Sequence, residues 1–383
     1  MVTVDESITV SAKKSESLLL NWQDSCVATE CTMHQLSPYI GKIKSIIAKD
    51  LILKYSKPGD LIVDPFSGSG TIPFEAILLN RKVFACDVSP YASVLTRAKL
   101  FAPLSLDEAN EQAEKLFKEI EKQPDPDLRK VPLWVRKFFN EQTLKETIKA
   151  VDICIKWHNN FLLSCILGIL HHQRPGFLSY PSSHLVPYLR DNKYPKNQFP
   201  ELYSYRPLRP RLLSKIERAY KRYGLRHKNN LGIYRQGQIE NIQLPDKFNC
   251  LITSPPYMNA LDYKRDNRLR LWFIRRDIAD VIDSKPIGNK KAFGTLMTSL
   301  AKKIEKSLII NGYCIFVVGE QMRRFPQNHP SEIVQSIISK HAPSLQLTNI
   351  ITDSIPDVRR SRKNCRGIKA EHFLVYQRHN YAF

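Results

Sequence analysis

Short apolar runs of strand length alternate with longer amphipathic stretches along much of the chain. The apolar runs lie at residues 61–63, 82–86, 231–236, 250–253, 312–319, 345–352 and 372–377. Helical patterns lie between several of them, at residues 46–55, 72–78, 89–100, 105–122, 141–170 and 212–223. Strands separated by helices are typical of a parallel sheet covered on both faces. The pattern therefore predicts a doubly wound α/β fold, with the last two runs forming an antiparallel pair.

The alternation is interrupted at about residues 103–230, before the expected third strand. Proline and tyrosine recur from 174 to 205, and residues 206–228 are strongly basic, with Glu217 as the one acid. This shift in composition is typical of an insertion, and its helical patterns predict a largely helical one. We therefore divide the chain into an N-terminal arm with the first half of the sheet domain (1–102), the insertion (103–230), and the second half of the sheet domain (231–383).

Composition and charge narrow the classes of protein. With 43% hydrophobic and 25% charged residues in 383, the chain is typical of a soluble globular enzyme. The 58 Lys and Arg against 37 Asp and Glu give a net charge of +21, which suits a polyanionic partner or serves solubility alone. No apolar run reaches the roughly 18 residues of a membrane span, and the polar start lacks the pattern of a signal peptide. The eight cysteines form no CxxC pair, so neither a metal site nor a disulfide framework is predicted.

The stretch at residues 62–76, IVDPFSGSGTIPFEA, is the first candidate for chemistry. An apolar run meets Asp64, then a turn with Gly68 and Gly70, then a helical pattern. Glycines permit positive φ and close approach of a ligand, and the N–H groups of the following helix suit a polar or anionic group. Asp87 ends the next strand, where an acid is placed to bind the hydroxyls of a ribose. Taken alone, the turn is also compatible with a tight loop that binds nothing.

A second stretch, CLITSPPY at residues 250–257, strengthens the ligand-binding interpretation. Here the chain resembles the DNA amino-methyltransferases, which use S-adenosylmethionine (AdoMet). DPFSGSGT is similar to their cofactor motif, and TSPPY is similar to their catalytic motif. A serine at the first position of SPPY resembles the enzymes that act on N4 of cytosine, whereas Asp or Asn is commoner in adenine enzymes. The resemblance covers about residues 33–100 and 232–378 and implies a Rossmann-like methyltransferase sheet.

The resemblance also implies which residues bind the cofactor. A segment before the glycine turn, with a Pro-Tyr pair, closes over the methionine end of AdoMet in the family. The turn after the second strand borders the adenine ring. The residues implied are Tyr39, Asp64, Pro65, Phe66, Gly68, Gly70, Thr71, Asp87, Val88, Pro90 and Gln238. Gln238 departs from the family, which often has Gly-Asp where this chain has Gly237-Gln238, and this leaves its role open. An amide is still able to hydrogen-bond the amino group or a ring nitrogen of adenine.

The catalytic motif supplies what methylation of an aromatic amine needs. The lone pair of cytosine N4 is delocalised into the ring, and hydrogen-bond acceptors aimed at its N–H bonds localise it. We expect Ser254 Oγ and the Pro255 carbonyl to be these acceptors, held rigid by Pro255 and Pro256. Tyr257 is expected to stack on the base once it leaves the duplex. Methylation at cytosine C5 instead requires a thiolate, usually in a Pro-Cys pair, and the sequence contains none.

Basic residues interleaved with tyrosines suit phosphate contact and base stacking. We therefore expect the insertion and a basic loop near the C-terminus to bind double-stranded DNA. The predicted DNA-binding residues are Arg206, Arg209, Arg211, Lys215, Arg218, Arg222, Arg359, Arg360, Arg362, Lys363 and Arg366. The insertion, residues 103–230, is our candidate for the DNA target-recognition region. In the common arrangements of the family that region falls elsewhere in the chain, so this assignment is a hypothesis. The lack of a membrane span and of a signal-peptide pattern predicts a cytoplasmic location, and by family analogy we expect a prokaryotic source and a companion restriction endonuclease.

The sequence thus predicts a site-specific cytosine-N4 DNA methyltransferase with AdoMet as cofactor, acting on a flipped base. Three alternatives stay open at this point. An adenine-N6 enzyme shares the whole logic, an RNA methyltransferase shares both motif types, and a non-catalytic nucleic-acid-binding protein would use the same scaffold. The recognition sequence and the oligomeric state are not given by the sequence.

Overall fold

A seven-stranded sheet forms the centre of the computed structural model, which describes residues 22, 30–183, 186–223, 232–256, 262–276, 290–321, 330–354 and 368–380. The strand order is β3-β2-β1-β4-β5-β7-β6. The strands are β1 (Leu61–Asp64), β2 (Lys82–Asp87), β3 (Gly232–Gln236), β4 (Phe248–Thr253), β5 (Leu308–Gln321), β6 (Leu345–Ser354) and β7 (Ile368–Arg378). This order, with the reversal point between β1 and β4, is that of a doubly wound α/β fold.

The first five strands run parallel, and the last two pairings are antiparallel. β1 pairs with β2 and β4, β2 with β3, and β4 with β5, all in parallel. β7 lies between β5 and β6 and is antiparallel to both. The predicted fold class is therefore confirmed, including the antiparallel pair at the C-terminal end. Because the parallel strands share one direction, the turns that follow β1, β2 and β4 lie at the same edge of the sheet.

Alternation of side chains along the strands gives the sheet two apolar faces. In β1, Ile62 packs into one hydrophobic cluster and Val63 into another, and in β2 Val83 and Phe84 divide in the same way. Successive residues of a strand point to opposite faces, so runs of apolar residues are buried on both. One face is covered by α2 (Ser45–Tyr55) and α3 (Thr71–Leu78), and the other by α12 (Lys290–Ser307) and α13 (Pro330–His341).

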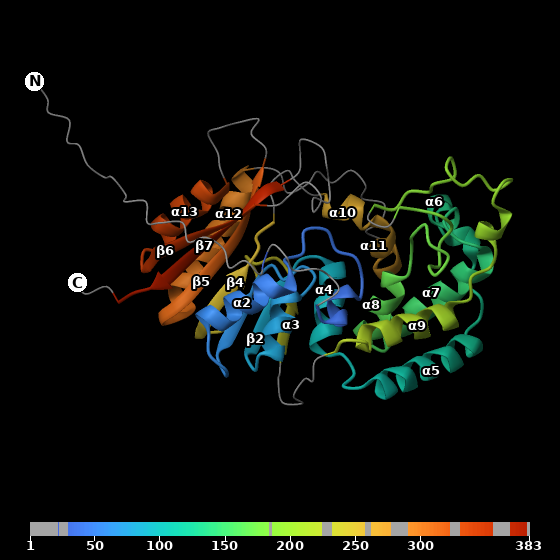
Figure 1. Cartoon of the computed structure of the whole chain (residues 1–383), viewed down its shortest axis with the longest axis horizontal. Coiled ribbons are helices and arrows are strands. Elements are labelled where there is room, and N and C mark those ends of the chain that lie inside the picture. The colour runs from blue at the N-terminus through green and yellow to red at the C-terminus, as the bar shows by residue number, and fades with distance from the viewer. Residues whose placement is uncertain are drawn as a thin grey trace, which may run out of the picture.

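The insertion adds a helical layer beside α4 (Pro90–Leu100), at the right of Figure 1. Its helices are α5 (Leu106–Lys122), α6 (Leu133–Arg136), α7 (Glu141–Lys156), α8 (Asn160–Gly168) and α9 (Leu208–Tyr220), with short turns η2 (Leu128–Lys130) and η3 (Pro200–Tyr203). Tyr91 and Leu95 of α4 belong to the same buried cluster as Leu162 and Cys165 of α8. The insertion therefore shares its hydrophobic core with the sheet domain.

The segment before the glycine turn is held between these two parts. It contains η1 (Thr32–Gln35), whose Thr32 hydroxyl donates to the Ala219 carbonyl at 2.8 Å. The Lys215 ammonium donates to the Gln35 carbonyl at 2.6 Å. Gly168 lies so close to this segment that a Cβ built there would be 1.9 Å from the Leu36 carbonyl oxygen. Residues 30–36 are thus fixed by α8 and α9.

Several local signals predict the helix ends correctly. Ser89 and Ser105 cap α4 and α5, each accepting a backbone N–H three residues on. One prediction is wrong, because the single helix expected at residues 141–170 is two helices. His158 has φ 54°, a left-handed conformation that ends α7, and Asn159 then caps α8.

The predicted N-terminal arm, residues 1–20, lies outside the described residues. Among the helices that the structure describes, none is both long and apolar enough to cross a membrane.

Candidate active site

The glycine turn follows β1 and leads into α3, as the sequence predicts. Gly68 and Gly70 have φ of 49° and 72°, in the left-handed region that favours glycine. A Cβ on Gly70 would lie 2.8 Å from the Thr96 Cα, and one on Gly68 would lie 3.2 Å from the ring of Tyr39. Both positions therefore need glycine for backbone conformation and for space. The turn leaves the N-terminus of α3 directed at the ligand-binding edge of the sheet.

Asp87 joins the end of β2 to this turn. Its carboxylate accepts the Gly68 N–H at 2.9 Å and the Ser89 N–H at 2.9 Å. Burial raises the pKa of Asp87, while hydrogen bonds from the backbone of Ser89, Gly68 and Val88 lower it. The Gly237 N–H donates to the Asp87 carbonyl at 3.0 Å, which brings Gln238 beside Asp87. Gln238 and Val88 are both exposed.

The cofactor motif and the catalytic motif are hydrogen-bonded to each other. The Thr253 hydroxyl, at the end of β4, donates to Asp64 Oδ1 at 2.7 Å, and the Phe66 N–H lies 3.3 Å from both Thr253 Oγ1 and Asp64 Oδ1. Burial raises the pKa of Asp64 to about 7, although these hydrogen bonds lower it. Ser254, the next residue, donates its hydroxyl to the Val317 carbonyl of β5 at 3.3 Å. The two motifs thus meet at the reversal point of the sheet.

Three tyrosine rings line the site beside the glycine turn. The Tyr39 ring lies 5.9 Å from the rings of both Tyr91 and Tyr263. The Tyr91 hydroxyl donates to the Pro38 carbonyl at 2.7 Å and contacts Ser37 Oγ at 2.5 Å, which fixes the segment that carries Tyr39. Burial raises the pKa of Tyr39 well above its ordinary value, with Asp87 as the next cause. Tyr39 is therefore a neutral ring that covers the turn near Asp87.

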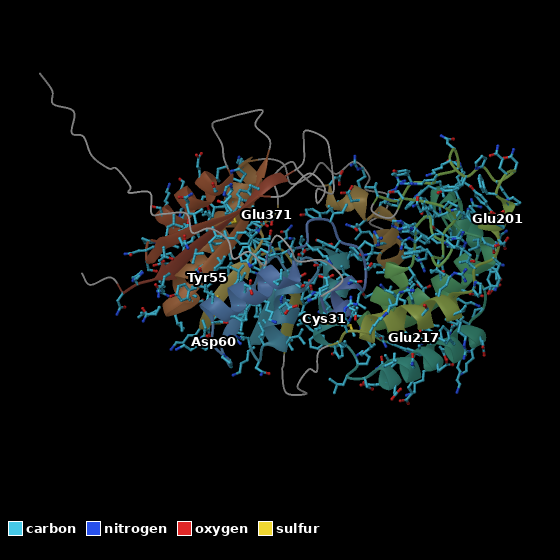
Figure 2. All side chains as sticks on the ribbon, in the orientation of Figure 1. Cys31, Tyr55, Asp60, Glu201, Glu217 and Glu371 are labelled. Carbon is cyan, nitrogen blue, oxygen red and sulfur yellow. The ribbon has the colours of Figure 1, made fainter. Side chains whose placement is uncertain are left out.

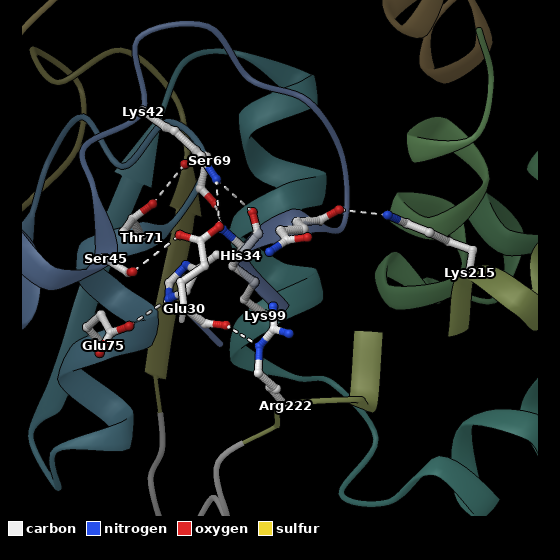
Figure 3. A network of polar contacts seen from close by, with 11 residues as sticks. Glu30, His34, Lys42, Ser45, Ser69, Thr71, Glu75, Lys99, Lys215 and Arg222 are labelled. Atoms are coloured by element: carbon white, nitrogen blue, oxygen red, sulfur yellow. Dashed lines mark hydrogen bonds and ion pairs between the residues drawn. The ribbon is translucent and has the colours of Figure 1, made fainter. Parts of the chain in front are cut away.

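A buried polar network supports the turn from behind (Figure 3). The Lys99 ammonium of α4 donates to the Ser69 carbonyl at 2.5 Å. Ser69 Oγ contacts Thr71 Oγ1 at 3.0 Å, and His34 Nε2 lies 2.7 Å from Glu75 Oε1. Every one of these five side chains is buried. The network fixes the turn to both α3 and α4.

Burial shifts the pKa of three groups in this network. Burial lowers the pKa of Lys99 to about 7. The charge of Lys42 also lowers this pKa, whereas Glu30, Cys31 and Glu75 raise it. Burial raises the pKa of Glu75 to about 7, and it holds the pKa of His34 well below 6.5 together with Lys99 and Lys42. At pH 7 His34 is therefore neutral, and its contact with Glu75 is a hydrogen bond rather than a full ion pair.

The side chains gathered at this edge fit AdoMet. Asp87 suits the two hydroxyls of the ribose, and the N-terminus of α3 suits the carboxylate of the methionine end. Val88, with half of its surface exposed, suits the apolar face of the adenine ring, and exposed Gln238 suits its polar edge. Within the described residues, no three His, Cys, Asp or Glu side chains gather closely enough to hold a metal ion.

The remaining residues predicted for the cofactor surround the same turn. Pro65 and Thr71 are buried, and Phe66 and Pro90 are partly exposed. Tyr257, the last residue of the catalytic motif, lies outside the described residues. Their predicted roles, like the roles of Ser254, Pro255 and Pro256, stay predictions.

The insertion residues predicted to bind DNA are largely engaged inside the protein. Arg206 is 3% exposed, and its guanidinium donates to the carbonyls of Phe177, Ser179 and Leu202. Arg209 pairs with Glu114 at 2.6 Å and stacks on Phe117. Lys215, as described above, donates to the Gln35 carbonyl. These groups stabilise the insertion, and we leave Arg206 and Lys215 out of the proposed DNA surface.

Other predicted DNA-binding residues also donate to nearby acceptors. Arg211 donates to the carbonyls of Pro207 and Pro175, and exposed Arg222 to the carbonyl of Glu30. Exposed Arg218 donates to Ser214 Oγ. The five basic residues predicted near the C-terminus, from Arg359 to Arg366, lie outside the described residues.

Sequence reasoning missed the residues that hold the site together. Thr253 directly precedes Ser254, so its place in the TSPPY motif was an available signal. Lys99 occupies a position in α4 where its neighbours are buried, and a lysine in such a pattern is a weaker signal. The pairing of His34 with Glu75 spans 41 residues, and no local pattern predicts it.

Comparison with known proteins supports a relationship to DNA amino-methyltransferases. Residues 6–96 match the family model described as DNA methylase. The Type II methyltransferase M.MjaII of Methanocaldococcus jannaschii is 29% identical over 68 residues, which are 18% of this chain and 13% of that protein. The chain thus spans about an eighth of the length of this relative. Neither match separates the cytosine-N4 type from the adenine-N6 type.

Similar solved structures are distant. TrmN from Thermus thermophilus is 9% identical with a TM-score of 0.37, and the alignment covers 90% of this chain and 52% of that one. A SAM-dependent methyltransferase from Methanosarcina mazei is 8% identical with a TM-score of 0.36, covering 86% and 97%. The rRNA methyltransferase AviRa from Streptomyces viridochromogenes is 11% identical with a TM-score of 0.35, covering 93% of each chain. Likenesses this weak carry no argument about function.

Proposed function

We propose that the protein transfers a methyl group from AdoMet to the exocyclic N4 amine of cytosine in double-stranded DNA. The observation that carries the proposal is the direct link between the two motifs, in which Thr253 Oγ1 donates to Asp64 Oδ1 at 2.7 Å. Through it, Ser254 stands at the same edge of the sheet as the glycine turn and Asp87. An amine bound at Ser254 would therefore lie near a cofactor bound at the turn.

AdoMet, when bound, supplies a methyl group on a positively charged sulfur. The protein's part is then mainly to position the amine for in-line displacement. Because the Ser254 hydroxyl donates to the Val317 carbonyl, its oxygen acts toward an incoming amine as an acceptor. The Pro255 carbonyl is the second acceptor. The methylated ammonium is acidic and loses its proton to Ser254 or water, so no strong general base is needed.

The target amine lies in the paired edge of the duplex, so the reaction needs the base to be extruded. Tyr257 is proposed to stack on the extruded base. The serine at position 254 is the reason for preferring cytosine N4, and a companion restriction endonuclease is proposed by family analogy alone.

Nucleoside mass analysis of duplex DNA incubated with the protein and AdoMet tests the proposal. We expect N4-methylcytosine, and we expect Ser254→Ala to lower the rate constant of transfer by roughly 100-fold, as for loss of one oriented hydrogen-bonding group. AdoMet affinity of Ser254→Ala should stay at the wild-type value, because the turn and Asp87 are unchanged. N6-methyladenine would overturn the choice of base but keep the mechanism. No methylated DNA base would overturn DNA as substrate and direct the same assay to RNA.

A further inference from the structure

Arg268, which is partly buried, joins three parts of the chain. It lies in α11 (Arg268–Ile274), and its guanidinium stacks on the Trp134 ring of α6 at 5.2 Å. The same guanidinium donates to the Pro187 carbonyl at 2.9 Å. The helix after the catalytic motif, α6 and the segment around residue 187 therefore lie side by side.

The residues next to these contacts present a mixed basic and apolar surface. Leu133, beside Trp134, is 59% exposed, and Tyr188, beside Pro187, is 50% exposed. Arg136 and Lys137 at the end of α6 are exposed, and so is Arg265 in α10 (Tyr263–Asp266). We define the α6–α10 surface as Leu133, Arg136, Lys137, Tyr188 and Arg265. Residues 128–137 hold four Lys and Arg and no acid.

This surface is close to the catalytic motif along the chain and at the cofactor site. α10 begins seven residues after Pro256, and its first residue, Tyr263, stacks near Tyr39 beside the glycine turn. Arg265 follows two residues later. Of the five surface residues, Arg265 is therefore the one that shares a short helix with a residue of the site.

The helices α6, α10 and α11 lie along the upper edge of the molecule in Figure 1, whereas α5 and α9 lie along the lower edge. Glu217, labelled in Figure 2, marks α9 on that lower side. The basic helix α9 therefore does not lie beside the part of the chain that follows the catalytic motif. Its inward-facing Lys215 and the partners of Arg218 and Arg222 agree with a structural role.

We propose that the α6–α10 surface binds the DNA duplex that flanks the target base, an inference that rests on the proposed function. Its guanidinium and ammonium groups suit the charge of phosphates. An exposed aromatic ring and an exposed leucine suit contact with a base or sugar once the duplex is opened. The surface itself contains no acid, and the neighbouring acids Asp127 and Asp266 are paired with Arg129 at 2.9 Å and with Arg265 at 3.6 Å.

Two double variants that remove equal charge test this proposal. Arg136→Gln with Lys137→Gln changes the proposed surface, and Arg218→Gln with Lys221→Gln changes exposed residues at the end of α9. Affinity for duplex DNA is measured between 50 and 200 mM salt. The logarithm of the binding constant falls with the logarithm of the salt concentration, with a slope of roughly 0.9 for each phosphate contact. We expect the first pair to reduce the slope by about 1.8 and the second pair to leave it unchanged.

A third variant separates stacking from charge. Tyr188→Ala should weaken DNA binding by roughly tenfold without a change in the salt slope. Equal slopes in the two double variants, or a larger loss from the α9 pair, would overturn the proposal. If the wild-type protein binds and methylates no DNA while it binds AdoMet, the proposed function itself is wrong. AdoMet affinity should be equal in all variants, which shows that the site is folded.

Discussion

Replacement of Gly168 by alanine tests the junction between the insertion and the sheet domain. Gly168 ends α8, and its φ is not in the left-handed region. From helix propensity alone, alanine here should stabilise the protein by roughly 0.5–1 kcal/mol. The structure predicts the opposite sign, because a Cβ would lie 1.9 Å from the Leu36 carbonyl oxygen.

The size of the effect follows from the displacement that the new methyl group requires. Ordinary van der Waals contact begins at 3.4 Å, so the Leu36 carbonyl must move by about 1.5 Å. Overpacking of this kind costs roughly 1–3 kcal/mol, and loss of a neighbouring hydrogen bond, such as Lys215 to Gln35, costs roughly 1 kcal/mol more. After subtraction of the helix gain, we expect Gly168→Ala to lower the free energy of unfolding by about 1–3 kcal/mol.

Urea unfolding measures this change, and a second glycine supplies the control. Gly294 lies inside α12 with no atom within 4 Å of an added Cβ, so Gly294→Ala should raise the free energy of unfolding by roughly 0.5–1 kcal/mol. Movement of Leu36 also displaces Tyr39, three residues on. Gly168→Ala should therefore weaken AdoMet binding, whereas Gly294→Ala should not. A Gly168→Ala protein as stable as the wild type would refute the close approach of α8 to residue 36.

Two further changes test buried groups. The pKa of Glu75 is raised from 4.5 to about 7 in the folded protein, so its contribution to stability is fully present below pH 4.5 and is lost as the pH rises through 7. In the wild type, Glu75 should lower the free energy of unfolding by about 3 kcal/mol between pH 4.5 and 7.5, and in Glu75→Gln this decrease should be absent. Urea unfolding at a series of pH values measures it. A pH profile that is the same in both proteins would contradict the assignment. Arg206→Met leaves three carbonyls without their donor and should cost roughly 2–4 kcal/mol, with no change in the salt dependence of DNA affinity. A reduced salt slope in that variant would show that Arg206 does contact phosphate.

The sheet was predictable because its signals are local. The strands β1, β2, β4 and β5 each contain a run of apolar residues, and the serines that cap α4 and α5 identify those helix starts. The glycine turn was also predictable, since positive φ at Gly68 and Gly70 has a direct sequence signal. Two motifs at the carboxyl ends of neighbouring parallel strands then have to meet.

The misplaced predictions concern side-chain direction and distant contacts. A basic sequence pattern indicates a charged helix, but it does not show that Lys215 turns inward to the Gln35 carbonyl. Arg206 is buried by contacts with residues 177 and 179, which precede it by more than 25 positions. The helix break at His158 depends on a left-handed backbone conformation at that residue. The sequence around it contains no glycine or proline that would have predicted the break.

The core that α4 and α8 share makes the insertion and the sheet domain one structural unit. Replacement of residues 103–230 by another sequence would remove the packing of Leu162 and Cys165 against α4. It would also remove the hydrogen bond from Lys215 to the Gln35 carbonyl, which holds the segment that leads to Tyr39. A chimera of that kind would expose apolar surface on both sides of the cut. The insertion is therefore expected to unfold together with the sheet domain rather than as a separate module.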